Sequence, residues 1–479
     1  MSVSRPQVAR HLEGSALYRT LWRWHFYAGL WCIPFIVVLA LSGSLYLFKP
    51  QFEAWQDREF HTVAFPGPRI GPVAEVRIAE GAVPGTRFAE YELPHAPQAA
   101  GRVWLRDAQG EKIRVVVQPV TGEVLDIVMA KSRPMQVIHD FHGELLLGDA
   151  GSLFVELAAC WAIVMVLTGL YLWWPRSANG LAGVLWIRFG AGSRLFWRDL
   201  HAVTAVWISL LVLFLLFTGL PWTGVWGKAF KEVRQLTGTA VMKQDWAQGR
   251  SGERREALGE AAGDEHAEHG GHDHAAMPAA AGESGIPAFT LDQVVATVAP
   301  LGWAPPVYVT PPGGKLSGPA RRQPVGPPGW NVRSDAQNRP LRESLVMDAR
   351  TGSVRQHETF ADKHIIDRVV GIGVAAHEGQ LFGVLNQLLG VLTAGGLVLM
   401  SVSGFVMWRR RKPDDRLGAP PPPVEAARYG TGLAAIIVFC ACFLPVLGVS
   451  LLVVGLLEWT VLRRIPGVRD WLGLAIPSR

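Results

Sequence analysis

The chain has few charged residues and few cysteines, and each of these features excludes some classes of protein. Charged residues make up 18% of its 479 residues, and there are four cysteines, Cys32, Cys160, Cys440 and Cys442. All four lie inside apolar stretches, where a thiol most often packs as a small hydrophobe. The sequence therefore predicts no disulfide framework and no zinc site built on paired cysteines. A G-x-G-x-x-G turn on a strand–helix–strand pattern is also missing, which argues against a dinucleotide-binding domain.

Long apolar runs dominate instead. Apolar residues account for 49% of the chain, and 19 residues are tryptophan. About 20 apolar residues in a helix cross the roughly 30 Å of hydrocarbon in a bilayer. Five segments are long enough and are predicted as transmembrane helices, over residues 24–48, 142–174, 199–225, 377–408 and 431–460. We therefore expect a mainly α-helical membrane protein, with the lipid bilayer as its first partner.

Basic residues in the short segments predict the orientation. Lys and Arg concentrate in the tail 1–23 and in the loops 175–198 and 409–430. Short basic segments stay on the cytoplasmic side, so we expect a multi-pass protein of the bacterial inner membrane with a cytoplasmic N-terminus. The net charge of +6 is explained by this topology and does not indicate nucleic-acid binding. Segments 49–141 and 226–376 then lie in the periplasm. A tail, 461–479, follows the last crossing, in which Pro445 is a candidate re-entrant bend.

The membrane segments repeat. In each of four, a histidine is followed at a fixed distance by a hydroxyl residue and a glycine, and the distance to the hydroxyl residue is 26 residues in two segments and 17 in the other two. The four sets are His142 with Thr168-Gly169, His377 with Ser403-Gly404, His25 with Ser42-Gly43 and His201 with Thr218-Gly219. Such repeats predict an internally duplicated helical bundle with a pseudo-twofold axis along the membrane normal. That symmetry would place His25 opposite His201 near the inner face, and His142 opposite His377 near the outer face.

Each periplasmic segment contains a predicted β-hairpin. Residues 111–128 and 342–358 alternate apolar and polar side chains around Thr121-Gly122 and Thr351-Gly352, which are typical turn residues. The second segment also has helical spacing over 290–302. We expect a small α+β domain in each segment.

A stretch over 245–285 is rich in Ala, Gly, Glu and His and is predicted to be a disordered linker. Its core contains four histidines, His266, His269, His272 and His274. Imidazole nitrogens bind transition metals, so these residues are a candidate accessory metal site. The alternative is a solvated low-complexity linker.

The opening of the first membrane segment, H-x-x-x-G-L from His25 to Leu30, and the two hairpins with Thr-Gly-x-Val at the turn resemble the PepSY-associated transmembrane family. This family includes inner-membrane proteins of iron-regulated operons and haem-containing siderophore-iron reductases. The resemblance covers roughly residues 15–470. It implies a di-haem electron conduit with two periplasmic PepSY-like domains, and it implies that His25, His142, His201 and His377 are the haem ligands.

The chemistry of the four histidines agrees with that implication. Ionisable side chains at membrane depth are costly and usually serve a function. Two imidazoles give a six-coordinate haem suited to electron transfer, so the sequence predicts two bis-histidine haem b groups. The alternative is that each histidine is an interfacial side chain. His139 lies one turn from His142 and could replace it as a ligand, and His364 is a weaker candidate of the same kind.

Two further features near the histidines have two interpretations each. Arg23 and Arg198 are predicted to pair with haem propionates, with lipid headgroups as the alternative partners. The Ser/Thr-Gly pairs are predicted mainly to pack helices, although their hydroxyls could also bind a ligand.

The function predicted from these features is a haem-dependent ferric reductase of the inner membrane. The cytoplasmic loops of 24 and 22 residues are too short for a flavin or nicotinamide domain, so electrons are expected from a separate cytoplasmic reductase or from quinol. The expected acceptor is iron(III) held by a siderophore in the periplasm. The alternatives are a non-enzymatic metal-binding or sensory membrane protein and a metal transporter.

Overall fold

The computed structural model describes residues 16–63, 67–175, 180–240, 289–313, 329–423 and 431–474. The chain divides into two units. The first, called the membrane unit here, comprises Met1–Ser44, His142–Phe230 and Leu388–Arg479. The second, called the sheet unit, comprises Leu45–Phe141 and Lys231–Gln387.

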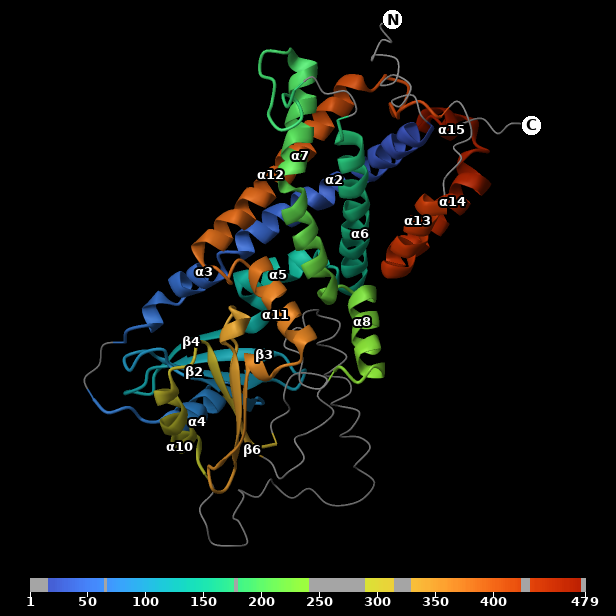
Figure 1. Cartoon of the computed structure of the whole chain (residues 1–479). Coiled ribbons are helices and arrows are strands. Elements are labelled where there is room, and N and C mark those ends of the chain that lie inside the picture. Colours follow the sequence, from blue (N-terminus) through green and yellow to red (C-terminus); the bar gives the residue numbers. More distant parts are fainter. Residues whose placement is uncertain are drawn as a thin grey trace, which may run out of the picture. The chain divides into compact units, whose positions relative to one another are not determined.

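Among the described residues, five helical segments are long and apolar enough to cross a membrane (Figure 1). They are α2 (Ala16–Tyr46), α6 (Gly148–Trp173), α7 (Ser193–Gly219) with the turn η3 (Leu220–Trp222), α12 (Val384–Arg411) and α14 (Pro445–Leu457) with the π-helical turn η7 (Glu458–Leu462). At 1.5 Å per residue, a helix of about 20 residues already spans the roughly 30 Å of hydrocarbon. The predicted multi-pass helical protein is therefore confirmed in its main feature.

The two outer histidines lie on separate helices and not at the start of the spans that the sequence predicts over 142–174 and 377–408. His142 lies near the end of α5 (Pro134–Glu144), and His377 is the last residue of α11 (Ile365–His377). Between α5 and α6 the backbone turns through Leu145 and Leu146, whose φ angles are 50° and 59°. Because leucine rarely adopts positive φ, the residue types at this position do not predict the break between α5 and α6.

A glycine permits the close return of the chain after that turn. A Cβ atom at Gly151 would lie 1.7 Å from the carbonyl oxygen of Glu144. No other residue type fits in this space, so the first turn of α6 packs directly on the end of α5. The turn between α11 and α12 likewise contains Gly379, with a φ of 73°.

The last apolar segment differs from the single crossing predicted over 431–460. It contains two helices, α13 (Thr431–Phe443) and α14, and the fifth candidate span begins at Pro445. Proline has no amide hydrogen and disfavours the helical conformation of the residue before it. Leu444 accordingly has φ −118° and ψ 83°. The bend at Pro445 is present, and it shortens the span.

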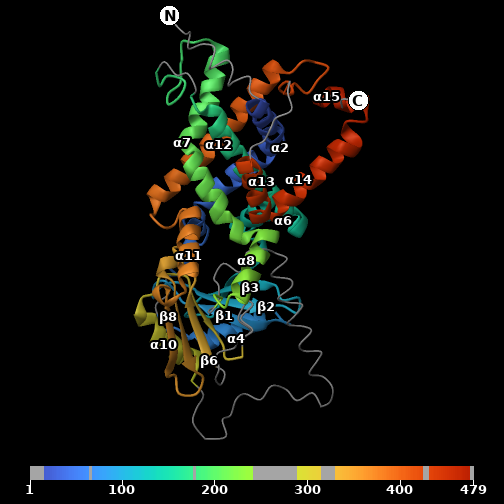
Figure 2. The same ribbon diagram turned by 45° about the vertical axis from the view of Figure 1, so that its right-hand side comes forward.

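Within the part of the chain that the structure describes, eight antiparallel strands form one sheet in the order β4-β3-β2-β1-β5-β6-β7-β8 (Figure 2). They are β1 (Arg87–Glu92), β2 (Gly101–Arg106), β3 (Lys112–Val117), β4 (Val124–Met129), β5 (Val307–Thr310), β6 (Gly329–Ser334), β7 (Glu343–Asp348) and β8 (Val354–Thr359). Both predicted hairpins are confirmed, since β3 pairs with β4 and β7 with β8. Gly122 and Gly352 occupy their turns with φ of 77° and 69°, which favours glycine.

The two sets of four strands are joined, although the sequence suggested one domain from each segment. Tyr91 of β1 pairs with Val309 of β5, and Glu92 pairs with Tyr308. Each of these strands would otherwise present unpaired backbone groups at the edge of a four-stranded sheet. Their pairing satisfies those groups and leaves β4 and β8 as the edges of the sheet.

One face of the sheet forms the apolar core of the sheet unit. Alternate residues of the inner strands, such as Val103, Val115 and Val332, are fully buried in a core that includes residues of α4 (Pro72–Ala82) and α10 (Leu291–Val298). Thr290 begins α10 with a capping box, a common helix start. Because side chains alternate along a strand, the intervening residues point to the opposite face.

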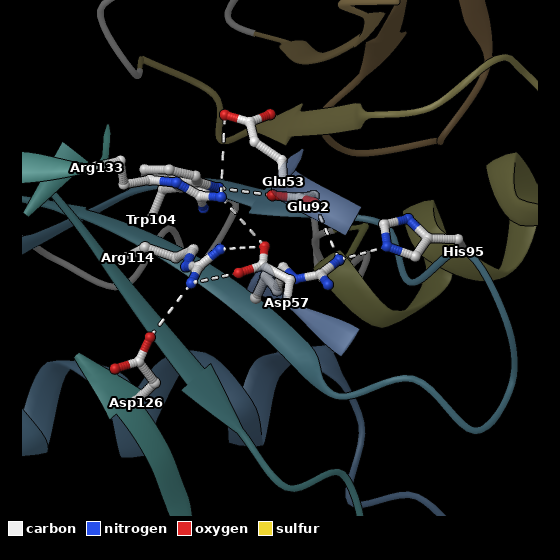
Figure 3. A network of polar contacts seen from close by, with 9 residues as sticks. Glu53, Asp57, Glu92, His95, Trp104, Arg114, Asp126 and Arg133 are labelled. Carbon is white, nitrogen blue, oxygen red and sulfur yellow. Dashed lines mark hydrogen bonds and ion pairs between the residues drawn. The ribbon is translucent and has the colours of Figure 1, made fainter. Parts of the chain in front are cut away.

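That opposite face is charged, and its charges are paired (Figure 3). Arg102 and Trp104 of β2 both donate to the carboxylate of Glu92, and Arg102 also contacts the ring of His95. Glu90 of β1 pairs with Lys112 of β3 and with Arg333 of β6, each at 2.8 Å. Burial alone would raise the pKa of Glu90, but the charges of Arg333 and Lys112 lower this pKa to about 2. Glu90 thus stays ionised and links strands from both sets.

Candidate functional site

Two histidines face each other inside the membrane unit. His25 lies on α2 and His201 on α7, and their ring centroids are 6.4 Å apart with the ring planes at 86°. Imidazole nitrogens ligate first-row metals at about 2 Å, and a ring centre lies about 1 Å behind its nitrogen, so two rings on opposite sides of one iron have centres roughly 6 Å apart. The separation of this pair fits that requirement.

The hydrogen bonds of His25 define its tautomer. Its Nδ1 lies 3.1 Å from the hydroxyl oxygen of Thr168. That hydroxyl donates its own hydrogen to the carbonyl of Val164 at 2.8 Å, so it accepts from His25. The proton of a neutral His25 is therefore on Nδ1, and the Nε2 lone pair is left for a ligand.

His201 also carries its proton on Nδ1, but a different group accepts the hydrogen bond. Its Nδ1 lies 3.0 Å from the carbonyl oxygen of Met400 and 3.3 Å from the hydroxyl of Ser403. A carbonyl can only accept, so Nδ1 of His201 must donate. Metal-binding histidines usually donate their second ring N–H in this way, which fixes the ring and raises its basicity.

His142 in α5 repeats the arrangement against α2. Its Nδ1 lies 3.0 Å from the hydroxyl of Ser42, and Ser42 donates to the carbonyl of Val38 at 2.8 Å. Three of the four predicted ligands thus share one hydrogen-bond pattern. His377 belongs to the sheet unit, and its pairing with His142 stays a prediction.

Each of these three rings also rests on a glycine. A Cβ at Gly169 would lie 3.1 Å from Cε1 of His25, and one at Gly43 would lie 3.1 Å from Cε1 of His142. At Gly404 the corresponding distance to His201 is 3.4 Å. Three of the four Ser/Thr-Gly pairs, predicted mainly to pack helices, therefore hold a histidine: the hydroxyl residue contacts Nδ1 and the glycine makes room for the ring.

A family model of the PepSY-associated TM region matches residues 22–411. The chain belongs to the PepSY-associated transmembrane family. The matched region contains all four predicted ligands and the hydroxyl and glycine residues described above. Among curated proteins, none matches the chain.

Arg23 of this PepSY-associated transmembrane protein has several partners within the protein, and its pairing with a propionate stays a prediction. It is buried, and its guanidinium donates to the backbone carbonyls of Pro420 and Gly473 and to the hydroxyl of Tyr27. Tyr27 in turn donates to the carbonyl of Leu472. Arg23 thus holds the end of α15 (Pro466–Leu472) and the loop before α13.

Arg198 pairs with a neighbouring carboxylate. Its side chain is 55% exposed and lies 3.4 Å from Asp199, which Arg188 holds through two bonds at 2.7 and 2.8 Å. Asp199 is fully buried, and its importance for the loop 175–198 was not predicted. The sequence did not indicate this role, because Asp199 is next to Arg198 in the chain but makes its two shortest bonds with Arg188.

The two alternative histidine ligands have other partners. His139 places Nδ1 3.1 Å from the carboxylate of Asp140, and its ring lies 5.5 Å from that of Tyr46. His364 is the N-cap of α11, where its Nδ1 accepts from the amide of Ile366. His364 therefore serves the start of the helix that ends at His377.

The predicted accessory metal site cannot be placed in this family member. His266, His269, His272 and His274 lie outside the described residues. Within the described ranges, no three His, Cys, Asp or Glu side chains gather in a way that could hold a metal ion.

Proposed function

We propose that this protein is a di-haem b oxidoreductase of the bacterial inner membrane, with its N-terminus in the cytoplasm, that passes electrons across the membrane to a ferric siderophore. The observation that carries the proposal is the shared state of His25, His142 and His201, whose Nδ1 atoms all meet oxygen acceptors. A histidine that merely lines the interface has no need of a fixed tautomer, a fixed ring and a glycine beneath it. A metal ligand needs all three.

The donor set fits haem iron. His25 and His201 would hold one haem, and His142 and His377 the other. Two imidazoles at each site would suit electron transfer and not oxygen binding. When bound, haem supplies the one-electron chemistry that the side chains lack. The protein's own residues fix the rings, keep water away and hold the two sites on opposite sides of the bilayer.

We also propose that the chain is an internal duplication. The inner histidine of α2 rests on α6 and that of α7 rests on α12, in each case on a hydroxyl residue and a glycine. The strand order, with β1 and β5 at the centre, has the same twofold character. These matches support two PepSY-like halves related by one axis.

The proposed electron path across the membrane needs a donor on the cytoplasmic side and an acceptor on the periplasmic side. The cytoplasmic loops leave no room for a flavin domain, so a separate reductase or membrane quinol supplies the electrons. A siderophore holds Fe³⁺ through hard oxygen atoms, and one electron converts it to Fe²⁺, for which such ligands have lower affinity. The reduced iron is then released outside the membrane.

Optical spectroscopy of the purified protein tests this function. After expression with sufficient haem, we expect a Soret band, a low-spin spectrum and two haems per chain. Reduced protein mixed with a ferric siderophore should reoxidise and form Fe²⁺, which a ferrous chelator detects. Protein without haem would overturn the proposal and favour a sensory protein or a transporter, and metal flux without a redox change would identify the latter.

A Thr168→Val variant tests the role of the hydroxyl groups. Valine keeps the shape of threonine but leaves Nδ1–H of His25 without its acceptor, and such outer-shell losses weaken metal binding about 10- to 100-fold. We expect the affinity for one haem to fall by that factor, measured by haem titration of the apoprotein. Thr393→Val is the matched control, because Thr393 is a buried threonine that bonds the carbonyl of Leu389. Equal affinities in the two variants would contradict the prediction.

A further inference from the structure

The helix that carries each outer histidine begins with a buried ion pair, and the two pairs have opposite polarity. Arg133 immediately precedes α5, nine residues before His142. Asp367 lies in the first turn of α11, ten residues before His377. The cation is on the histidine helix in the first half of the chain, and the anion is on it in the second half.

The first pair joins α5 to the helix that follows α2. Arg133 donates to Asp57 at 3.3 Å, and Asp57 directly follows α3 (Lys49–Gln56). Both side chains are buried, with 9% and 7% of their surfaces exposed. Arg114 of β3 binds the same carboxylate at 2.6 and 3.1 Å (Figure 3), so Asp57 is fixed to the sheet and Arg133 is fixed to Asp57.

The second pair joins α11 to the helix that follows α7. Arg234 of α8 (Val225–Leu236) holds Asp367 through two bonds at 2.5 and 2.8 Å. Arg234 is 1% exposed and Asp367 is 7% exposed. The guanidinium also donates to the carbonyl of Thr239. A buried two-bond pair of this kind fixes both helices in direction as well as in distance.

The ordinary explanation by helix capping applies to only one of the two pairs. A carboxylate in the first turn of α11 is favoured by the positive end of the helix dipole. An arginine at the start of α5 is disfavoured by the same dipole and is tolerated because Asp57 is beside it. The shared property is therefore the buried pairing itself, at the start of each histidine helix and one residue apart in the two repeats.

We propose that Arg133 with Asp57 and Arg234 with Asp367 are positioning residues for the outer haem site, each holding the helix that presents His142 or His377. This inference rests on the proposed function. The opposite polarity also disfavours the wrong pairing of helices. If α5 met α8, Arg133 would lie near the cation Arg234. If α11 met α3, Asp367 would lie near the anion Asp57. Each histidine helix thus selects the correct partner in its own half of the chain.

The test uses a protein in which only the outer haem remains. In a His201→Leu background, Asp367→Asn removes the charge with little change of shape. We expect the outer haem to be bound at least about tenfold more weakly and its low-spin electron paramagnetic resonance signal to be replaced in part by a high-spin one. The exchange variant with Arg234→Asp and Asp367→Arg should recover the low-spin signal.

Controls separate this role from a general loss of structure. Asp348→Asn breaks an ion pair with Arg355 at the exposed β7–β8 turn of the same unit and should leave the outer signal unchanged. In the chain with both sites intact, Asp367→Asn should leave the inner haem in place, and loss of both haems would overturn the positioning role. An unchanged outer signal in Asp367→Asn would also overturn it while leaving the proposed function standing. Absence of haem from the wild-type chain would instead remove the proposed function.

Discussion

A His201→Leu variant is expected to hold one haem per chain in place of two and to lose transmembrane electron transfer by at least about 100-fold, more than the loss of an outer-shell partner costs. The reason is geometric, since His201 is the partner of His25 across the 6.4 Å between their rings. Leucine has a similar volume and no nitrogen, so the helix can form while the ligand is lost. Haem per chain and reduction of an external ferric siderophore by an enclosed reductant in proteoliposomes measure the two effects.

His139→Gln is the control for this prediction. His139 bonds to Asp140, whereas His142, one turn later, has the Ser42 hydroxyl on its Nδ1. The variant should therefore retain both haems and most of the activity. Loss of a haem in His139→Gln would assign the outer ligand to His139, and two haems with an unaltered spectrum in His201→Leu would show that His201 is not a ligand.

The second large effect is expected from Asp57→Ala in the sheet unit. Asp57 is the shared partner of Arg114 and Arg133, and both arginines are at most 9% exposed. Removing one partner of a buried ion pair typically costs about 3–5 kcal/mol, and Asp57→Ala leaves the buried Arg114 and Arg133 without the carboxylate that they share. We expect the free energy of unfolding of the sheet unit to fall by that amount, measured by pulse proteolysis in urea.

Asp126→Ala provides the matched comparison. Asp126 pairs with the same Arg114 at 3.2 Å, but its side chain is 36% exposed. A pair at the surface contributes only about 0–1 kcal/mol, so this variant should be close to wild type. Equal losses of unfolding free energy in the two variants would mean that burial does not determine the cost of removing the carboxylate.

The effect of Asp57 should also depend on pH. Burial alone would raise the pKa of Asp57, but Arg114 and Arg133 lower it below its ordinary 3.8. A carboxylate with a lowered pKa stabilises the folded state above the unfolded-state pKa, and this contribution is lost as the pH falls through the folded-state value. The difference between wild type and Asp57→Ala should thus be complete at neutral pH and shrink below about pH 3.8.

The sequence predicted the spans and the inner histidines well, because both depend on local or repeated patterns. Apolar length identifies a membrane helix, and the equal spacing of the four histidine sets identified the residues involved, although the contacts join members of different sets, such as His25 with Thr168 and His142 with Ser42. The same repeats could not reveal that His142 and His377 end separate helices. The break after α5 depends on two leucines with positive φ, and leucine gives no sign of that conformation.

Roles that depend on hydrogen bonds to the backbone also could not be predicted from the sequence. Arg23 has the position expected of a propionate partner, but it bonds carbonyl groups from the far end of the chain. A carbonyl is present in every residue, so no residue type signals such a contact. The role of Ser42, Thr168 and Ser403 was predicted only in part. Their spacing was evident, whereas the direction of each hydroxyl required the packed helices.

The pairing of β1 with β5 sets an order of events during synthesis. Strand β1 is made before α6 and α7, and β5 is made after both. Until the later strand arrives, the edge of β1 is open, Tyr91 lacks the neighbour Val309, and Glu90 lacks Arg333. An open edge of this kind readily pairs with other chains. The edge of β1 therefore stays open until β5 has been made and has paired with it, and release from the ribosome before β5 should yield a product prone to aggregation and proteolysis.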